Sequence, residues 1–343
     1  MTTARRLPAE WEPQDGVLLA WPHAATDWAP VLPRVEPVFA ELAARIAEAG
    51  IVLVAAADPA RAERALAHAR VPRDRVRLYP VPTNDTWARD FGPLTVEEDG
   101  RPRLLDFGFN GWGLKFAADR DNRVTRRLHE LGAFGATPLE TVGLVLEGGS
   151  IESDGAGTIL TTRECLLGPN RNPHLDRAGV ETALGRHLGA ERVLWLEHGR
   201  LEGDDTDAHV DTLVRLAPDD TLLYVACDDP ADGHFAALEA LADEVRALRT
   251  RRGRPYRLVP LPWPRPCYDG EGHRLPATYA NYLAIDGAVL VPTYGDPKDA
   301  EALDAVAEGF PGRRVIGVDC APLILQHGSL HCVTMQLPRG VLP

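Results

Sequence analysis

Apolar residues recur at three- and four-residue spacing in five stretches of the chain, the spacing that places them on one face of a helix. The first stretch shows the pattern clearly, with Phe39, Leu42, Ala43 and Ile46 on one face. The five predicted helices are residues 35–49, 122–131, 177–188, 235–251 and 298–308. Each is amphipathic, so each is expected to pack one side against a larger core.

A short strand rich in Val, Leu and Ile, with Pro, Gly or Asp beyond it, is predicted after each helix. These strands are residues 75–80, 143–146, 192–196, 256–260 and 314–319. Each strand leads into a polar loop that holds the most unusual residues of its unit. The five loops are residues 84–90, 147–150, 203–211, 279–281 and 331–332.

The pattern of helix, strand and loop therefore repeats five times. Successive loop markers lie 53 to 70 residues apart when the markers are Asp90, Glu147, His209, Tyr279 and Cys332. Units of similar length predict an α/β fold with pseudo-fivefold symmetry, in which equivalent edges face one axis and the loops meet in one pocket. In two separate domains some of these loops would lie far from the others. Residues 1–343 are therefore predicted to form a single domain.

The composition is that of a globular protein, with 45% hydrophobic and 25% charged residues among 343. A net charge of −13 disfavours a nucleic-acid partner, and the basic run 246–257 is interpreted as the solvated end of a helix. The five cysteines form no C-x-x-C pair, so neither a disulfide framework nor a structural zinc site is predicted. No signal peptide or membrane span is visible, which predicts a reducing, cytoplasmic setting.

Cys332 is the candidate nucleophile, although a lone cysteine in a strand-like run is more often a buried small hydrophobe. The neighbouring His331 adds little, because adjacent residues on a strand point to opposite faces. His209 and Asp211, two apart on a predicted strand, are expected to face one pocket. Glu147 precedes two glycines that allow a close backbone approach. A thiol, an imidazole and carboxylates in one pocket together favour nucleophilic catalysis.

Trp87 and Asp90 share a loop that can hold a flat cation, because carboxylates accept paired N–H groups and an indole face attracts positive charge. Two aspartates can pin a guanidinium group and spread its charge while its carbon becomes tetrahedral. The bound cation also stabilises a thiolate. His209 can protonate the departing ammonia and later activate water. The set predicts a small cationic guanidine substrate, and it contains no apparent metal cluster.

The ordered motifs closely resemble the agmatine deiminase family, within the guanidine-modifying (pentein) superfamily that includes bacterial-type peptidylarginine deiminases. The resemblance covers nearly the whole chain, through residues 8–13, 19–22, 84–93, 109–113, 146–150, 170–173, 203–211, 279–281 and 331–334. It implies a five-bladed α/β-propeller without a cofactor, and a homodimer or tetramer. The implied reaction is hydrolysis of agmatine to N-carbamoylputrescine and ammonia through a covalent thiouronium-type intermediate.

The resemblance also implies a role for each candidate residue by position. The implied roles are Cys332 as nucleophile, His209 as general acid/base, Glu147 as the carboxylate that supports the histidine, Asp90 and Asp211 as guanidinium ligands, Trp87 as a pocket tryptophan, and Asp205 as the partner of the distal amine.

Two departures from the family pattern bear on the substrate. Many relatives have Asp-Gly-His where this chain has Ala208 before the histidine, and many have a glycine-rich run where it has residues 325–329. Bulkier residues on the loop that precedes the candidate nucleophile are expected to reshape or rigidify the pocket. His327, in that loop, is interpreted as a solvent-exposed histidine rather than a pocket residue.

Three alternative functions remain open from the sequence. The chain could deiminate peptidyl arginine or another guanidine compound, or transfer the amidino group to an amine instead of water. It could also be a binding module without catalysis, which the presence of the cysteine, the histidine and three carboxylates disfavours.

Overall fold

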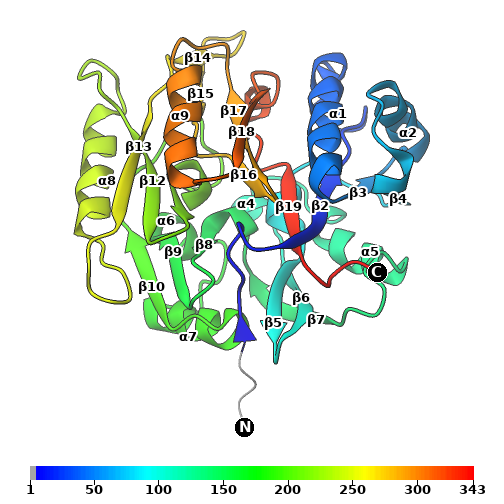
Figure 1. Cartoon of the computed structure of the whole chain (residues 1–343), viewed down its shortest axis with the longest axis horizontal. Coiled ribbons are helices and arrows are strands. Elements are labelled where there is room, and N and C mark those ends of the chain that lie inside the picture. The colour runs from blue at the N-terminus through cyan, green and yellow to red at the C-terminus, as the bar shows by residue number, and fades with distance from the viewer. Residues whose placement is uncertain (1–4) are drawn as a thin grey trace.

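The structure, a computed structural model, describes residues 5–343, and within them are six β-sheets and nine α-helices. In Figure 1 the helices α2, α5, α7 and α8 lie at the rim of the molecule, while strands β8, β16 and β19 lie nearer its middle. No helix among these residues is long and apolar enough to cross a membrane.

The first sheet joins the two ends of the chain. Its strand order is β19 (Thr334–Pro338), β2 (Gln14–Ala20), β3 (Ile51–Ala56) and β4 (Val76–Pro80). Helix α1 (Leu32–Ala49) connects β2 to β3, and α2 (Pro59–His68) with the short 3-10 helix η1 (Arg73–Arg75) connects β3 to β4. Because the last strand pairs with an early one, the turn just before β19, which holds the candidate nucleophile Cys332, is brought back against the N-terminal segment.

Apart from β1 at the start of the chain, the strands of the second and third sheets lie within residues 94–196. The second has the order β1 (Arg5–Arg6), β5 (Leu94–Glu98), β6 (Arg101–Gly108) and β7 (Leu139–Val145). The third contains β8 (Ile151–Ser153), β9 (Thr158–Thr162) and β10 (Arg192–Leu196). Their helical segments are α3 (Ala88–Phe91), α4 (Gly111–Leu114), η2 (Asp121–Arg123), α5 (Val124–Glu130), η3 (Gly148–Ser150), α6 (Arg163–Leu166) and α7 (Arg177–Leu188).

The remaining sheets follow the same order along the chain. The fourth contains β11 (Val214–Ala217), β12 (Thr221–Ala226) and β13 (Arg257–Pro262), and the fifth contains β16 (Leu283–Ile285), β17 (Ala288–Thr293) and β18 (Arg314–Asp319). Strands β14 (Cys267–Tyr268) and β15 (Arg274–Leu275) form a small hairpin. The helical segments are η4 (Val210–Thr212), α8 (Phe235–Ala247), α9 (Asp299–Gly309) and η5 (Ile324–Gln326).

The five larger sheets share one pairing scheme. In each, one strand pairs antiparallel with its neighbour, which pairs parallel with the next strand. Parallel neighbours need a crossover connection, and in all five sheets that connection contains a helix. The repeated unit is therefore an antiparallel pair extended by a strand–helix–strand crossover.

Most of the predicted periodicity is confirmed. The first helix buries Phe39, Leu42, Ala43 and Ile46 as expected, and the predicted segments 177–188, 192–196 and 314–319 coincide with α7, β10 and β18. The predicted helix 235–251 is too long, because α8 ends at Ala247 and the backbone of Leu248 is extended. Most of the basic run 246–257 therefore lies in a turn rather than in the last turn of a helix.

The local structure of two candidate segments also differs from the prediction. Residues 210–212, expected on a strand, form η4, in which the Thr212 hydroxyl donates to the His209 carbonyl over 2.8 Å. Cys332 lies in a turn immediately before β19 rather than on the strand itself. The alternation of faces therefore does not apply to His331 and Cys332, and both side chains are buried.

Candidate active site

A cavity of about 250 Å³ is lined by residues that are far apart in the sequence, the first being Asp27 and the last Cys332. Five of the seven predicted site residues line it: Cys332, His209, Asp90, Trp87 and Asp205. The other lining residues are Asp27, Asp85, Trp112, Phe116, Asp204, Thr206, Thr212, Gln326, His327 and Gly328. The remaining two predicted residues, Glu147 and Asp211, are fully buried beside this wall.

Gly149 shows how closely three of the predicted side chains approach one another. A Cβ atom at this position would lie 2.6 Å from His209 Nδ1, 2.9 Å from Asp90 Oδ1 and 3.0 Å from Asp211 Oδ2. The Gly149 N–H instead donates to Asp90 Oδ1 over 3.0 Å. Any larger residue would force these groups apart, so the glycine next to Glu147 permits the convergence that the sequence predicts.

The two aspartates, Asp90 and Asp211, are both buried carboxylates. Asp90 accepts a hydrogen bond of 2.9 Å from Trp112 Nε1, and burial raises the pKa of this carboxyl. Asp211 Oδ2 faces His331 Nδ1 at 2.7 Å, while Oδ1 is buried without a partner among the described residues. Burial acts to raise the pKa of Asp211, but His331, His209 and Arg215 together outweigh it and lower the pKa. An ionised, incompletely paired carboxylate in such a place favours a cationic ligand.

His209 is 1% exposed, and neither ring nitrogen has a hydrogen-bond partner among the described residues. Its Nδ1 lies 3.7 Å from Asp90 Oδ1. Burial acts to lower the pKa of His209, but the negative charge of Asp90 and the interaction with Cys165 outweigh it and raise the pKa to about 10. The ring therefore holds an extra proton at neutral pH, as a general acid must before it donates.

Cys332 is 6% exposed, and its Sγ donates to Asn281 Oδ1 over 3.3 Å. Burial raises the pKa of the thiol well above its usual range, and the nearby charges of Asp211 and Asp90 raise it further. Without a ligand, Cys332 is therefore a neutral thiol. A cation bound between the two aspartates offsets their charge and favours the thiolate. Asn281 also gives the predicted loop 279–281 a role, since it holds the nucleophile.

Sequence reasoning missed His331, whose ring bridges two carboxylates. Its Nδ1 contacts Asp211, and its Nε2 hydrogen bonds to Glu10 Oε2 in the N-terminal segment. Glu10 also pairs with Arg215 at 3.2 Å and Arg89 at 3.3 Å. The ring fixes the orientation of Asp211, so the N-terminal segment supports the cation site from behind.

Sequence reasoning also missed Arg171, from the 170–173 motif. Its Nε lies 3.0 Å from both Glu147 oxygens, and its Nη1 lies 2.7 Å from Asp207 Oδ2. Glu147 lies close to His209, but its carboxylate makes no hydrogen bond to the ring. The predicted support of His209 by Glu147 therefore involves no hydrogen bond in this structure and stays a prediction, while Arg171 sets the position of the carboxylate.

Aromatic and acidic side chains form the outer walls of the cavity. Trp87 packs against Trp28 with ring centroids 5.6 Å apart, and a Cβ on Gly328 would collide with the Trp87 ring at 2.1 Å. The interpretation of His327 as a solvent-exposed loop residue is wrong, because the half-buried side chain lines the cavity, with Nδ1 2.7 Å from the Gly203 carbonyl oxygen. Among the described lining residues there is no Arg or Lys.

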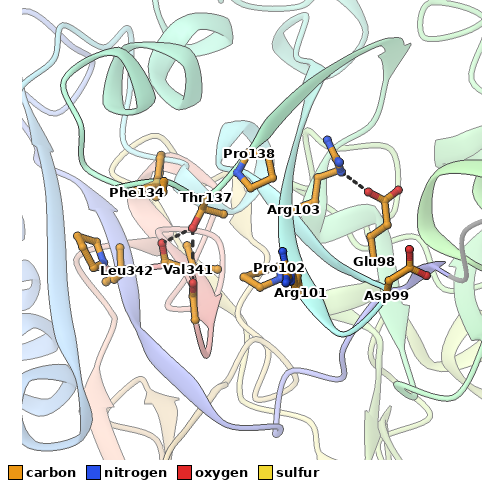
Figure 2. A pocket seen from close by; sticks show the side chains of 13 residues that line it. Glu98, Asp99, Arg101, Pro102, Arg103, Phe134, Thr137, Pro138, Val341 and Leu342 are labelled. Atoms are coloured by element: carbon orange, nitrogen blue, oxygen red, sulfur yellow. Dashed lines mark hydrogen bonds and ion pairs between the residues drawn. The ribbon is translucent and has the colours of Figure 1, made fainter.

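A larger cavity of about 950 Å³ lies elsewhere, beside the last residues of the chain (Figure 2). Arg103 Nε donates to Glu98 over 2.6 Å, and the Thr137 hydroxyl donates to the Val341 carbonyl over 2.9 Å. The described residues that line it include no cysteine or histidine. The smaller cavity is therefore the candidate active site, since its described lining combines a thiol, an imidazolium and carboxylates, and that of the larger cavity does not.

We predict that Glu10→Gln lowers the free energy of unfolding by about 3 kcal/mol, because it removes one charge from a buried network. The substitution is to be tested by urea denaturation at neutral pH. The pKa of Glu10 is lowered in the folded protein, since His331, Arg215 and Arg89 outweigh burial. Its contribution is thus present above the unfolded pKa of about 4.3 and declines as the pH falls below that value.

The matched control for that measurement is Glu97→Gln, whose partner Arg6 is partly exposed. This pair should contribute less than about 1 kcal/mol. Equal losses in the two variants, or a Glu10 effect that grows in acid, would contradict the assigned role of Glu10.

Comparison with known proteins gives a consistent family match. Residues 6–338 match the family model described as Porphyromonas-type peptidyl-arginine deiminase. The chain is 34% identical to agmatine deiminase of Ectopseudomonas mendocina (strain ymp), with 97% of this chain and 95% of that protein covered. It is 35% identical to agmatine deiminase of Pseudomonas aeruginosa (strain LESB58), at the same coverage.

Solved structures extend the match. A substrate-bound cysteine-to-serine variant of C. jejuni agmatine deiminase is 35% identical with a TM-score of 0.91, covering 98% of this chain and 97% of that one. A candidate arginine deiminase from Porphyromonas gingivalis is 49% identical with a TM-score of 0.93, covering 99% of this chain and all of that one. An amidinotransferase from Microseira wollei, at 13% identity, 98% coverage of both chains and a TM-score of 0.54, shares the fold alone.

Proposed function

The chain belongs to the Porphyromonas-type peptidyl-arginine deiminase family, and from that premise we propose that it hydrolyses agmatine to N-carbamoylputrescine and ammonia. Family membership makes it a hydrolase of guanidine C–N bonds. The observation that supports agmatine most directly is the cavity itself. Asp90 lines the cavity and Asp211 is buried beside it, so the two can hold the guanidinium group, and further aspartates line the same cavity.

The catalytic cycle follows from the positions and charges of four side chains. Asp90 and Asp211 bind the guanidinium group, which offsets their charge and lets Cys332 lose its proton to solvent. The thiolate adds to the guanidinium carbon, and His209 gives its proton to one nitrogen as the C–N bond breaks and ammonia leaves. The product of this half-reaction is a thiouronium cation on Cys332, with His209 neutral.

Water completes the cycle. Neutral His209 takes a proton from water as its oxygen adds to the thiouronium carbon, and the C–S bond then breaks to release the thiolate and the protonated urea group. The urea loses its extra proton to solvent, so the products are N-carbamoylputrescine and ammonia. Glu147, held by Arg171, stabilises the charged state of His209 through both half-reactions.

The distal end of the cavity favours an amine over a carboxylate. Asp205 lines the cavity with Asp27, Asp85 and Asp204, and no described lining residue is an Arg or Lys that could pair with the carboxylate of free arginine. Agmatine carries an ammonium group where arginine carries both an ammonium and a carboxylate. We therefore expect ammonia release to be faster from agmatine than from arginine.

A second candidate substrate is peptidyl arginine. The name of the family model and the exposure of Phe116, 46%, at the cavity wall favour it. An ammonia-release screen over agmatine, arginine, an arginine-containing peptide and methylated guanidines separates these substrates. Activity on the peptide with none on agmatine would overturn the proposed substrate and leave the guanidine chemistry intact. Ornithine-type acceptors in the same assay test amidino transfer.

Asp205→Asn should raise KM for agmatine by about tenfold. This rise corresponds to ~1.4 kcal/mol of binding free energy, lost with one partly exposed ion pair between Asp205 and the distal amine. Butylguanidine lacks the distal amine, so its KM should stay within about twofold. Asp219→Asn, on the turn between β11 and β12, is the control variant. Equal rises in KM for both substrates would show that Asp205 does not contact the amine.

We also propose the finer architecture that the resemblance implies. Five sheets with one pairing scheme, the closure of the first by β19 against β2, and loops that share one cavity support a five-bladed α/β-propeller formed by a single domain. The oligomeric state and the cytoplasmic location stay predictions.

A further inference from the structure

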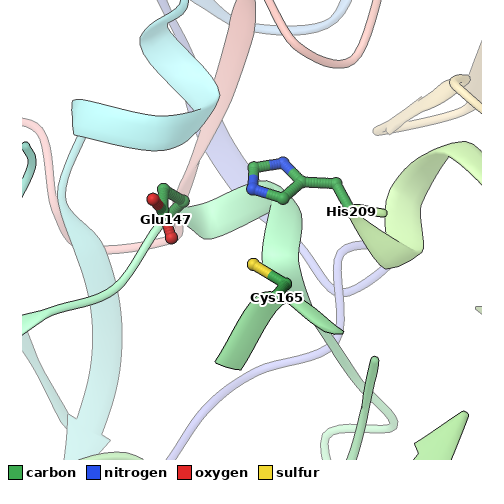
Figure 3. Close-up of side chains that lie close together, drawn as sticks. All are labelled: Glu147, Cys165 and His209. Carbon is green, nitrogen blue, oxygen red and sulfur yellow. The ribbon is translucent and has the colours of Figure 1, made fainter. Parts of the chain in front are cut away.

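Three buried side chains that can ligate a metal lie together beside the cavity (Figure 3). One carboxylate oxygen of Glu147, the sulfur of Cys165 and one ring nitrogen of His209 lie within 4.8 Å of one another. Their exposed fractions are 0%, 0% and 1%. No metal site is predicted from the sequence, because the three positions show no short ligand spacing.

Cys165 supplies no reacting group in the proposed reaction. It lies in α6, on the side of His209 opposite to the substrate aspartates: Nδ1 of the ring faces Asp90 at 3.7 Å, and Figure 3 shows the other ring nitrogen turned toward Glu147 and Cys165. Neither nitrogen has a hydrogen-bond partner among the described residues. A buried imidazole without partners is rare and indicates a ligand that the chain itself does not supply.

The donor set is that of a thiophilic divalent cation. Thiolate sulfur, imidazole nitrogen and carboxylate oxygen are the three ligand types of protein-bound Zn²⁺, at about 2.0–2.3 Å from the metal. Three ligands leave one tetrahedral position, which the cavity side can fill with water. Small rotations of buried side chains bring groups 4.8 Å apart to the distances of one coordination shell.

The neighbouring Arg171 is the main electrostatic objection to a metal here, since its guanidinium group lies 3.0 Å from the Glu147 oxygens. Two facts offset it. Arg171 is also paired with Asp207 at 2.7 Å. A divalent cation displaces one proton from the Cys165 thiol and one from the His209 ring, so the net charge beside Arg171 does not change.

We propose that Glu147, Cys165 and His209 form an inhibitory binding site for Zn²⁺ or a cation of the same thiophilic class. A metal on the far ring nitrogen fixes His209 and takes the place of one of the two protons of the imidazolium ring. The proton that remains on Nδ1 then belongs to a neutral, metal-bound ring, which is a weaker acid toward the leaving nitrogen than the imidazolium. Metal binding rests on this geometry alone, while inhibition rests also on the proposed function. The metal is an inhibitor and has no part in the hydrolytic cycle.

Co²⁺ is the probe for binding, because a thiolate ligand gives Co²⁺ a charge-transfer absorption in the near ultraviolet. Wild type and Cys332→Ala should both bind one Co²⁺ with this absorption, and Cys165→Ser and Cys165→Ala should both lose it. Cys227→Ser, a change at a buried cysteine outside the cluster, should keep it. Absorption that survives in both Cys165 variants, or is lost in Cys332→Ala alone, would overturn the proposal, as would no absorption in wild type.

Inhibition is measured as ammonia release from agmatine at increasing Zn²⁺, relative to the rate of each variant without metal. Loss of one of three ligands should raise the half-inhibitory Zn²⁺ concentration by at least about 100-fold in Cys165→Ser, and a chelator should restore the wild-type rate. Thermal melts check that each Cys165 variant folds. If the wild-type protein binds Co²⁺ but releases no ammonia from agmatine in the absence of metal, the proposed function is wrong. The proposed metal site is then still supported.

Discussion

Cys332→Ala should lower kcat/KM for agmatine by about 10⁴-fold or more, since it removes the protein atom that forms a bond to the substrate carbon. Cys332 Sγ lies at the cavity wall, held by Asn281, with Asp90 and Asp211 close enough to raise its pKa. Substrate affinity should change little by comparison, because the cation site is formed by other residues.

Ammonia release by a coupled assay measures this effect, with Cys320→Ala as the matched control. Cys320 is buried in the last part of the chain like Cys332, but it does not line the cavity. Residual activity within about tenfold of wild type in Cys332→Ala would mean that another group attacks the guanidine carbon.

Asp90→Asn should have opposite effects on turnover and on the reactivity of the thiol. Loss of one buried charge that pairs with the guanidinium group should lower kcat/KM by about 100- to 1,000-fold, equivalent to ~3–4 kcal/mol. The same change removes a negative charge that raises the pKa of Cys332. Without substrate, alkylation of Cys332 should therefore begin at a lower pH in Asp90→Asn than in wild type.

The pH profile of iodoacetamide inactivation tests the second effect directly. In wild type, where the pKa of Cys332 lies above its usual range, the rate should rise only at alkaline pH. Asp27→Asn, an exposed carboxylate at the same cavity, should leave the profile in place. A profile that moves to higher pH in Asp90→Asn, or does not move, would show that Asp90 does not control the thiol.

The candidate chemistry was predictable because each catalytic group stands in a loop that interrupts a regular apolar pattern. Five of those groups line one cavity, and Glu147 and Asp211 lie beside it. The backbone that positions them was less predictable: His209 and Asp211 meet around Gly149 through a 3-10 turn, whose hydrogen bonds are made by Thr212 and Leu213 rather than by a strand partner.

The supporting residues could not be predicted because their partners are far away in sequence. His331 contacts Glu10, 321 positions earlier, and Asp211, 120 positions earlier. On the sequence alone, Glu10 belongs to a terminal segment and Arg171 to a polar loop. Only the pairing of β19 with β2 brings the nucleophile turn to the N-terminal segment. The interpretation of His327 as a solvent-exposed residue is wrong for the same reason, because its partner is far away in sequence. The backbone carbonyl of Gly203 holds the His327 side chain in the cavity wall.

The central claim is covalent attack by Cys332 on a guanidinium carbon held between Asp90 and Asp211. The most direct test is mass spectrometry of wild-type protein quenched with acid during turnover of agmatine. We predict an added mass equal to agmatine minus ammonia, confined to the peptide that contains Cys332. Ammonia release with that peptide unmodified throughout, or with the added mass on Cys165 instead, would contradict the account.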